Sequence, residues 1–351
     1  MNIRSLDGPN LAAVLLGKRE INLLDLNDPL LGANQVRVSI EASAICGTQL
    51  GEWYQSRGED LYLPHCFGHE AVGRVIEIGT DIQEFKVGDR VIISWIKSGY
   101  QNAPPPLFHD ASSGAKINFG ECCTFIRRGI FPENRLVKID ENIGSSSAAM
   151  IGCAFLIAYA ALKRSTLNWT RLDQKTVIIG AGGVGLAAAL LAQALKIPVT
   201  CIDVPTVIDR LKQQNIGVTF VATDDAIQGL QNFFNTVIIC TGEPAGFTLS
   251  QKLLLNNQGE IYIVGNPPYG HSVSIEVKPL LYGRNIIGIG EKDVDLPTDI
   301  LSIINLINTE RLDAARLVNK IFDISDINKA FEFAAERNGG KTVLKISEQK
   351  L

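Results

Sequence analysis

The spacing of apolar and polar residues divides the chain into two parts with different predicted secondary structure. In the first part, short β-branched or alternating runs are separated by Gly, Asp and Pro, which is typical of strands in a small barrel. The predicted strands are residues 35–45, 70–79, 87–95, 121–128 and 135–139. The Pro-, Gly- and Ser-rich stretch between the third and fourth runs, residues 97–120, is predicted to be a loop.

The second part alternates apolar strand-like runs with helical stretches. It begins with residues 145–165, which have the length and composition of a buried helix with Ser residues available as caps. The segments that follow are strand-like runs at 176–180, 198–203, 218–222, 236–240 and 260–265, and helical stretches at 183–196 and 206–215. This alternation predicts a parallel sheet with helices on both faces. Two further helices, 299–308 and 326–336, and a last strand, 341–346, complete the predicted α/β fold.

Composition narrows the classes of function. The chain has 351 residues, a net charge of −4 and 46% apolar residues, so two packed domains are expected rather than one. No basic stripe indicates nucleic acid, and no run of about 20 apolar residues predicts a membrane span. The apolar run 11–16 meets Lys18 and Arg19, which argues against a signal peptide and for a cytoplasmic protein. The seven cysteines are odd in number, so core thiols or metal ligands are expected rather than disulfides.

A glycine-rich loop stands between a predicted strand and a predicted helix. Gly180, Gly182 and Gly185 have the spacing G-x-G-x-x-G, with a β-branched strand before them and an Ala/Leu-rich helix after them. In that context the first glycine allows a tight turn, the second lets the backbone approach a pyrophosphate, and the third lets helix and sheet pack closely. The helix N-terminus then offers free N–H groups to the phosphates. The alternative is a glycine-rich turn that binds nothing.

Asp203 ends the next strand-like run and is a candidate for coenzyme selection. A carboxylate at this place accepts hydrogen bonds from the adenine ribose hydroxyls and repels a 2′-phosphate. Residues 204–206 add no cation that could hold such a phosphate. The sequence therefore favours NAD over NADP. The alternative is that Asp203 only caps the helix that begins near Thr206.

A series of motifs follows the chain in order. They are CGTQL from Cys46, GHEAVGRVIEIG from Gly68, VGDRV from Val87, the GC pair that ends at Cys153, GRNIIGIG from Gly283 and GKTVLKI from Gly340. Together they resemble the zinc-containing alcohol dehydrogenases of the medium-chain dehydrogenase/reductase superfamily, over nearly the whole chain. The resemblance implies a GroES-like catalytic domain of residues 1–155 and 291–351, a Rossmann coenzyme domain of residues 156–290, and a catalytic zinc between them.

The resemblance implies that Cys46, His69 and Cys153 hold the zinc, with water or substrate in the fourth position. Two thiolates and one imidazole are an open catalytic set for tetrahedral zinc. Taken alone, Cys46 is better explained as a core thiol, and His69 as a core histidine. By the same resemblance Glu70 is expected close behind the metal, and Thr48 is expected to take the first proton from the substrate.

The chain also departs from this family. No cysteine lies between Cys66 and Cys122, so one catalytic zinc and no structural zinc are expected. The Pro-rich loop 100–119 replaces that lobe; it either shapes the substrate mouth, forms a subunit contact or is a plain surface loop. Gln49 stands where the family usually has an Asp that supports the His ligand. Gly51 stands where some members have a His that passes the proton to solvent.

The predicted function is an NAD(H)- and zinc-dependent oxidoreductase that moves a hydride between the coenzyme and an alcohol, aldehyde or ketone. Cys as third ligand favours an alcohol; a sugar or polyol dehydrogenase and a non-catalytic nucleotide-binding protein stay open as alternatives. Trp95 is expected to wall the substrate pocket, unless it is a core aromatic at the barrel end. A homodimer or homotetramer is expected, paired through an edge strand at 285–290. The residues assigned to the coenzyme are Gly180, Gly182, Gly183, Val184, Gly185, Asp203, Thr241 and Lys341.

Overall fold

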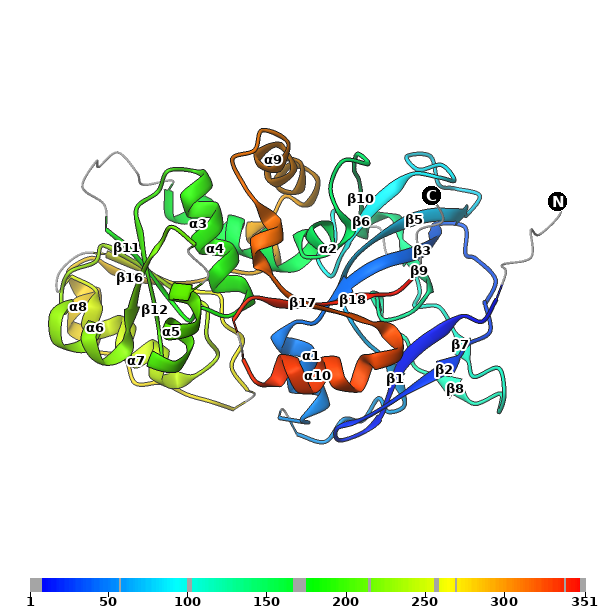
Figure 1. Ribbon diagram of the computed structural model, residues 1–351, viewed down its shortest axis with the longest axis horizontal. Coiled ribbons are helices and arrows are strands. Elements are labelled where there is room, and N and C mark those ends of the chain that lie inside the picture. The colour runs from blue at the N-terminus through cyan, green and yellow to red at the C-terminus, as the bar shows by residue number, and fades with distance from the viewer. Residues whose placement is uncertain are drawn as a thin grey trace.

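Two β-sheet regions lie at opposite ends of an elongated molecule, with helices between them (Figure 1). The computed structural model describes residues 8–56, 58–99, 103–166, 175–213, 216–255, 259–268, 270–337 and 339–347. One region is a mixed, barrel-like arrangement, and the other is a parallel sheet covered by helices. The predicted α/β fold is therefore confirmed.

The barrel-like region contains a seven-stranded sheet in the order β10-β6-β5-β3-β18-β17, with β9 paired to β3 at its side. A three-stranded sheet in the order β2-β1-β4 lies against it. The strands are β1 Leu11–Gly17, β2 Glu20–Asp25, β3 Gln35–Ala44, β4 His65–Cys66, β5 Glu70–Ile78, β6 Arg90–Ser94, β9 Arg128–Pro132, β10 Leu136–Lys138, β17 Val318–Asp323 and β18 Lys341–Lys345. Strands β3, β5, β6, β10 and β18 confirm predicted runs, whereas β1, β2 and β17 were not predicted.

The predicted strand at 121–128 is wrong, because β9 begins only where the predicted strand ends. The backbone of this segment finds partners on different elements instead of one neighbouring strand. Phe125 N–H bonds to Phe67 O at 3.0 Å, and Arg127 N–H bonds to Leu11 O at 2.9 Å. A segment that crosses between two sheets satisfies its backbone in this way and buries successive rather than alternate side chains.

The parallel sheet has the strand order β13-β12-β11-β14-β15-β16. From β11 the chain adds β12 and β13 on one side of the sheet, and then crosses to add β14, β15 and β16 on the other side. In sheets of this kind, ligands bind at the carboxyl ends of the strands where the direction of addition reverses. All five predicted strands are present. The elements are β11 Thr176–Ile179, α4 Gly183–Ala194, β12 Val199–Asp203, α5 Pro205–Gln213, β13 Thr219–Ala222, α6 Thr223–Gly229, β14 Thr236–Ile239, α7 Pro244–Leu253, β15 Gly259–Ile263, α8 Val277–Leu281 and β16 Arg284–Gly288. Residues 214–215, the end of the predicted helix 206–215, lie outside the described residues.

The apolar stretch 145–165 forms helix, as predicted, but with an interruption. It consists of α2 Ser145–Ala148, a π-helical turn Ile151–Phe155 and α3 Leu156–Thr166. Its length and apolar character would allow a membrane span, yet 78% of its apolar 18-residue window is buried inside the fold. The helical segments continue without a break across residue 155. The domain boundaries at residues 155 and 290 stay a prediction.

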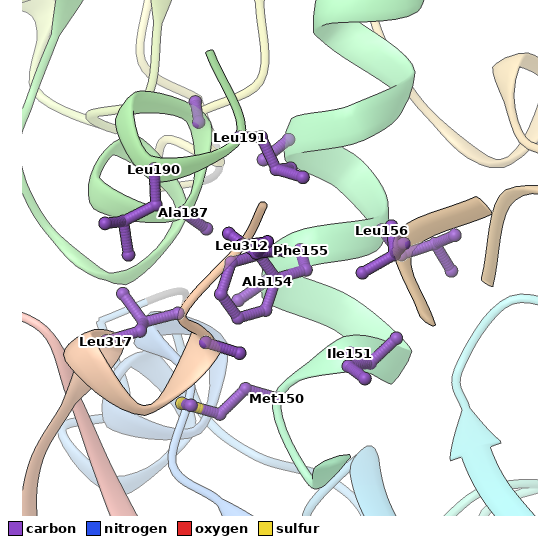
Figure 2. Close-up of a cluster of buried hydrophobic side chains, with 14 of the residues drawn as sticks. Met150, Ile151, Ala154, Phe155, Leu156, Ala187, Leu190, Leu191, Leu312 and Leu317 are labelled. Carbon is purple, nitrogen blue, oxygen red and sulfur yellow. The ribbon is translucent and has the colours of Figure 1, made fainter. Parts of the chain in front are cut away.

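A shared core joins the two regions along these helices. Figure 2 shows side chains of the π-helical turn packed against α4 and against the chain that leads back to the barrel. The labelled members are Met150, Ile151, Ala154, Phe155, Leu156, Ala187, Leu190, Leu191, Leu312 and Leu317. The remaining helices are α1 Gly47–Trp53, α9 Leu296–Asn308 and α10 Ile327–Ala335; the last two match predicted helices.

The Pro-rich segment is more ordered than a plain loop. It carries a short antiparallel pair, β7 Phe108–His109 and β8 Lys116–Ile117. Phe108 is 0% exposed and Ile117 is 2% exposed, and both pack with side chains of β1 and β4. The segment therefore completes a small core of its own beside the barrel. Residues 100–102 of it lie outside the described residues, and its role at the substrate mouth stays a prediction.

Candidate active site

Four donor side chains from three separate segments meet in one place. Cys46 directly precedes α1, His69 precedes β5, Glu70 begins β5, and Cys153 is the middle residue of the π-helical turn. Their sulfur, nitrogen and oxygen donor atoms all lie within 4.8 Å of one another. Glu70 and Cys153 are buried, whereas Cys46 and His69 are half-buried. The three residues predicted as zinc ligands are thus brought together with Glu70.

The cluster has the chemistry of a metal site. The sulfur atoms of Cys46 and Cys153 lie within 4.8 Å of each other, and the contact with Cys153 holds the pKa of the Cys46 thiol well below its ordinary value. The same contact, together with burial, raises the pKa of Cys153. Nε2 of His69 is buried and has no hydrogen-bond partner among the described residues. Two sulfur donors and an unpartnered imidazole nitrogen fit a tetrahedral zinc ion.

Gln49 connects two of these donor residues. It stands in the first turn of α1 and is 2% exposed. Its amide oxygen accepts from Cys46 N–H at 3.1 Å, and its amide nitrogen faces Nδ1 of His69 at 2.9 Å. An NH₂ group donates, so it favours the imidazole form that carries its proton on Nε2. A metal at Nε2 needs the proton on Nδ1 and an acceptor beside it, so metal binding requires this amide to turn.

Glu70 is held on both sides. One carboxylate oxygen forms an ion pair with the ammonium of Lys341, and the other accepts from Ala154 N–H at 3.2 Å. Burial raises the pKa of Glu70, and the neighbouring Lys341 opposes that rise. Burial alone would lower the pKa of Lys341, but the Glu70 carboxylate and the thiols raise it. The pair is therefore a buried salt bridge.

Lys341, predicted to contact the coenzyme, touches the glycine loop only with its aliphatic stem. A Cβ on Gly183 would lie 2.5 Å from Cδ of Lys341. Its charge is directed to Glu70 instead. The residue therefore connects the candidate metal cluster with the candidate coenzyme loop.

Two residues predicted to face the substrate lie beside the cluster. The ring of Trp95 is half-buried and its centroid lies 6.3 Å from that of His69. Thr48 is half-buried in the first turn of α1, two residues after Cys46, and Gly51 lies one turn further along. These positions are compatible with the predicted roles, which stay predictions.

The glycine loop joins β11 to α4 at the carboxyl edge of the parallel sheet. Gly180 has a φ of +97°, a region that favours glycine. A Cβ on Gly185 would lie 1.8 Å from the Gly180 carbonyl oxygen, so only glycine lets α4 begin this close to the strand. A Cβ on Gly182 would meet no atom of the described residues within 4 Å, which leaves space before the helix N-terminus. Open space at a helix N-terminus is compatible with the predicted pyrophosphate site, which stays a prediction.

Asp203 and Thr241 border the same loop. Asp203 accepts from Ala181 N–H at 2.6 Å and from Val204 N–H at 2.7 Å, so it holds the loop rather than only capping α5. Thr241 follows β14, and its backbone nitrogen would lie 3.0 Å from a Cβ on Gly180. The residues predicted to bind the coenzyme thus surround one strand-to-helix turn.

The π-helical turn around Cys153 was missed in the sequence. A glycine inside an apolar helix was the available signal, because such a glycine usually has a packing reason. A Cβ on Gly152 would lie 2.3 Å from the carbonyl oxygen of Ile93 in β6. Ser94, the next residue of β6, contacts this turn, and a single Ser in a strand gave no signal of it.

The chain is similar to known dehydrogenases along its length. Residues 32–141 match the family model of the alcohol dehydrogenase GroES-like domain. L-Threonine 3-dehydrogenase of Photorhabdus laumondii is 24% identical, over 94% of this chain and 97% of its own length. An alcohol dehydrogenase of Geobacillus stearothermophilus is 25% identical, over 94% of this chain and 97% of its own length.

Solved structures share the fold. Benzyl alcohol dehydrogenase from Acinetobacter calcoaceticus has a TM-score of 0.81 at 24% identity, covering 97% of this chain and 100% of its own. An alcohol dehydrogenase zinc-binding domain protein from Burkholderia ambifaria has a TM-score of 0.86 at 21% identity, with 97% and 100% covered. Both regions of the fold are therefore shared with these proteins.

We expect Gln49→Glu to tighten zinc binding about 10-fold. The two side chains have the same shape, but a carboxylate accepts from both Cys46 N–H and the Nδ1–H of His69. This leaves the Nε2 lone pair free without turning the side chain. The dissociation constant for zinc, measured by competition with a chromogenic chelator, checks the effect.

Gln231→Glu is the matched control for this prediction, because it adds the same charge at an exposed position near the parallel sheet. It should leave zinc affinity unchanged. Equal or weaker zinc binding by Gln49→Glu would show that the amide does not limit the tautomer of His69.

Proposed function

Because the chain belongs to the zinc-containing alcohol dehydrogenases of the medium-chain dehydrogenase/reductase superfamily, we propose that it moves a hydride between NAD(H) and a small alcohol, aldehyde or ketone. Its relatives are dehydrogenases over their full length, which supports an oxidoreductase that acts on alcohol groups. The observation that carries the proposal is the meeting of Cys46, His69 and Cys153 beside a strand-to-helix glycine loop.

We propose one catalytic zinc per chain on Cys46, His69 and Cys153, and no structural zinc. Two thiolates and a neutral imidazole leave one position of a tetrahedral ion open. Zinc bound there supplies Lewis acidity, which favours the alkoxide form of an alcohol. The protein itself holds the three zinc-binding side chains in place and keeps the Glu70 carboxylate next to them. The Trp95 ring limits the space that is open to the substrate beside His69.

The proposed coenzyme is NAD(H) rather than NADP(H). The glycine loop and the N-terminus of α4 accept the pyrophosphate, and the Asp203 carboxylate repels a 2′-phosphate by its charge. Val204, Pro205 and Thr206 offer no cation in compensation. The full proposed set is Gly180, Gly182, Gly183, Val184, Gly185, Asp203, Thr241 and Lys341, the last through its stem against the loop.

The proposed substrate is a small uncharged alcohol, because the Trp95 ring lies close to the candidate ligand His69 and narrows the space at the cluster. The comparison with known proteins supports L-threonine as a second candidate substrate. Several full-length relatives are L-threonine 3-dehydrogenases. L-Threonine therefore belongs in any substrate panel, next to polyols and simple alcohols. We also propose that the protein acts in the cytoplasm.

Metal analysis and turnover test the proposal together. The purified chain should contain about one zinc per chain, and chelation should abolish NADH formation from its best alcohol, with recovery on adding zinc. Cys153→Ala should lose both metal and turnover, whereas Cys201→Ala, a buried thiol of β12, should keep both. Two tightly bound zincs, full activity of Cys153→Ala, or a better kcat/KM with NADP would contradict the proposal. Bound zinc and NADH without turnover would favour a non-catalytic role.

Thr48→Ala should lower kcat by about 10²–10⁴, the usual span for a positioned proton-transfer group, and Thr48→Ser should cost little. We propose that the Thr48 hydroxyl takes the substrate proton. Gly51 has no side chain that could accept the proton from Thr48. The next acceptor is therefore a water molecule next to Gly51 or the Glu52 carboxylate. Steady-state kinetics, with zinc content and NADH binding as checks, measures the effect. Wild-type kcat in Thr48→Ala with both ligands bound would mean another proton route.

We propose that two copies of the chain form a homodimer through α8 and the edge strand β16. A homotetramer would be built from two such dimers. Val277 is 65% exposed, Leu281 is 79% exposed and Tyr282 is 60% exposed, and within the described residues β16 pairs on one side only. Leu281→Asp should shift the chain toward monomer in sedimentation equilibrium, because it places a charge in that apolar face. Leu30→Asp, 94% exposed near the barrel, is the control. A wild-type monomer would exclude the dimer.

A further inference from the structure

The residue at the centre of the π-helical turn is Cys153, one of the proposed zinc ligands. Phe155 N–H bonds to Met150 O at 3.2 Å, five residues earlier instead of four. A turn of this kind takes neighbouring backbone groups out of the regular helical ladder. All five residues of the turn are buried, so the freed groups need partners from elsewhere in the fold.

Two side chains outside the helix supply those partners, one on each side of Cys153. The hydroxyl of Ser94 donates to the carbonyl oxygen of Gly152 at 2.6 Å. The carboxylate of Glu70 accepts from Ala154 N–H at 3.2 Å. The backbone on both sides of the cysteine is therefore held by side chains of β6 and β5.

Ser94 is itself fixed in direction. It is 0% exposed, and its oxygen accepts from Ile96 N–H at 3.1 Å. With that lone pair occupied, its proton is directed to the Gly152 carbonyl. The residue before it, Ile93, forms the backbone surface on which Gly152 rests, where no Cβ could fit. The backbone of β6 thus fixes how close the turn lies to the sheet, and the Ser94 hydrogen bond fixes the orientation of the Gly152 carbonyl.

We propose that Ser94 is a positioning residue for the metal centre. It does not belong to the donor cluster, and it acts through Gly152 to keep the Cys153 sulfur within reach of Cys46 and His69. Without its hydroxyl the buried Gly152 carbonyl loses this donor, and the turn is freer to relax toward a regular α-helix. Such a change rotates the sulfur away from the other donors. This inference rests on the proposed zinc site.

The test compares Ser94→Thr with Ser94→Val, since these β-branched side chains have the same shape and differ in the hydroxyl. Cobalt(II) replaces zinc as the probe, because its visible and thiolate charge-transfer bands report the geometry and the sulfur ligands. Ser94→Thr should keep the wild-type affinity and spectrum. Ser94→Val and Ser94→Ala should bind cobalt and zinc about 10–100-fold more weakly, with altered bands.

Ser250→Ala is the matched control for a lost buried hydroxyl. Ser250 is also 0% exposed and also donates to a backbone carbonyl, Phe247 O, at 2.6 Å, but within α7. It should reduce thermal stability without changing metal affinity, and NADH binding confirms folding of each variant. Equal metal binding by the Val and Thr variants overturns the inference and leaves the zinc site intact. A wild-type chain that takes up neither metal overturns the zinc site and the inference with it.

Discussion

The buried carboxylate of Glu70 is the constraint on which the arrangement of the site depends. Glu70 is 0% exposed, and an isolated charge there would be strongly unfavourable. It is compensated by Lys341 of β18 and by the N–H of Ala154 in the π-helical turn. Each partner comes from a different part of the chain, so satisfying this one charge fixes β5, β18 and the turn relative to one another.

The same connection relates the two candidate binding sites. Lys341 binds Glu70 with its ammonium and lies against Gly183 with its stem. The apolar core of Figure 2 supports this junction from the side of α3 and α4. The donor cluster and the glycine loop are therefore built on one junction, which limits how far the spacing between the proposed zinc site and the proposed coenzyme site can vary. This is the positioning that hydride transfer needs.

The sequence predicted what depends on local pattern and on motif order. Apolar periodicity located the parallel strands, and the ordered motifs indicated Cys46, His69 and Cys153, which the fold brings together. Contacts between segments that are distant in the sequence could not be predicted from it. The segment 121–128 has the composition of a strand, but its hydrogen bonds go to several elements, which composition does not encode. Likewise nothing in the sequence shows that Ser94 meets Gly152.

The ion pair of Glu70 and Lys341 has a consequence for the order in which the molecule assembles. The two residues are 271 positions apart, so the contact closes a very long loop. The entropy cost of closure grows only slowly with length, but such a contact forms late compared with local ones. While the chain is being synthesised, β3 and β5 emerge from the ribosome long before β18. Until β18 pairs with β3, Glu70 lacks its counter-ion, and the carboxylate has to stay hydrated or protonated. The ion pair that compensates Glu70 can therefore be completed only after β18, near the other end of the polypeptide, has been synthesised.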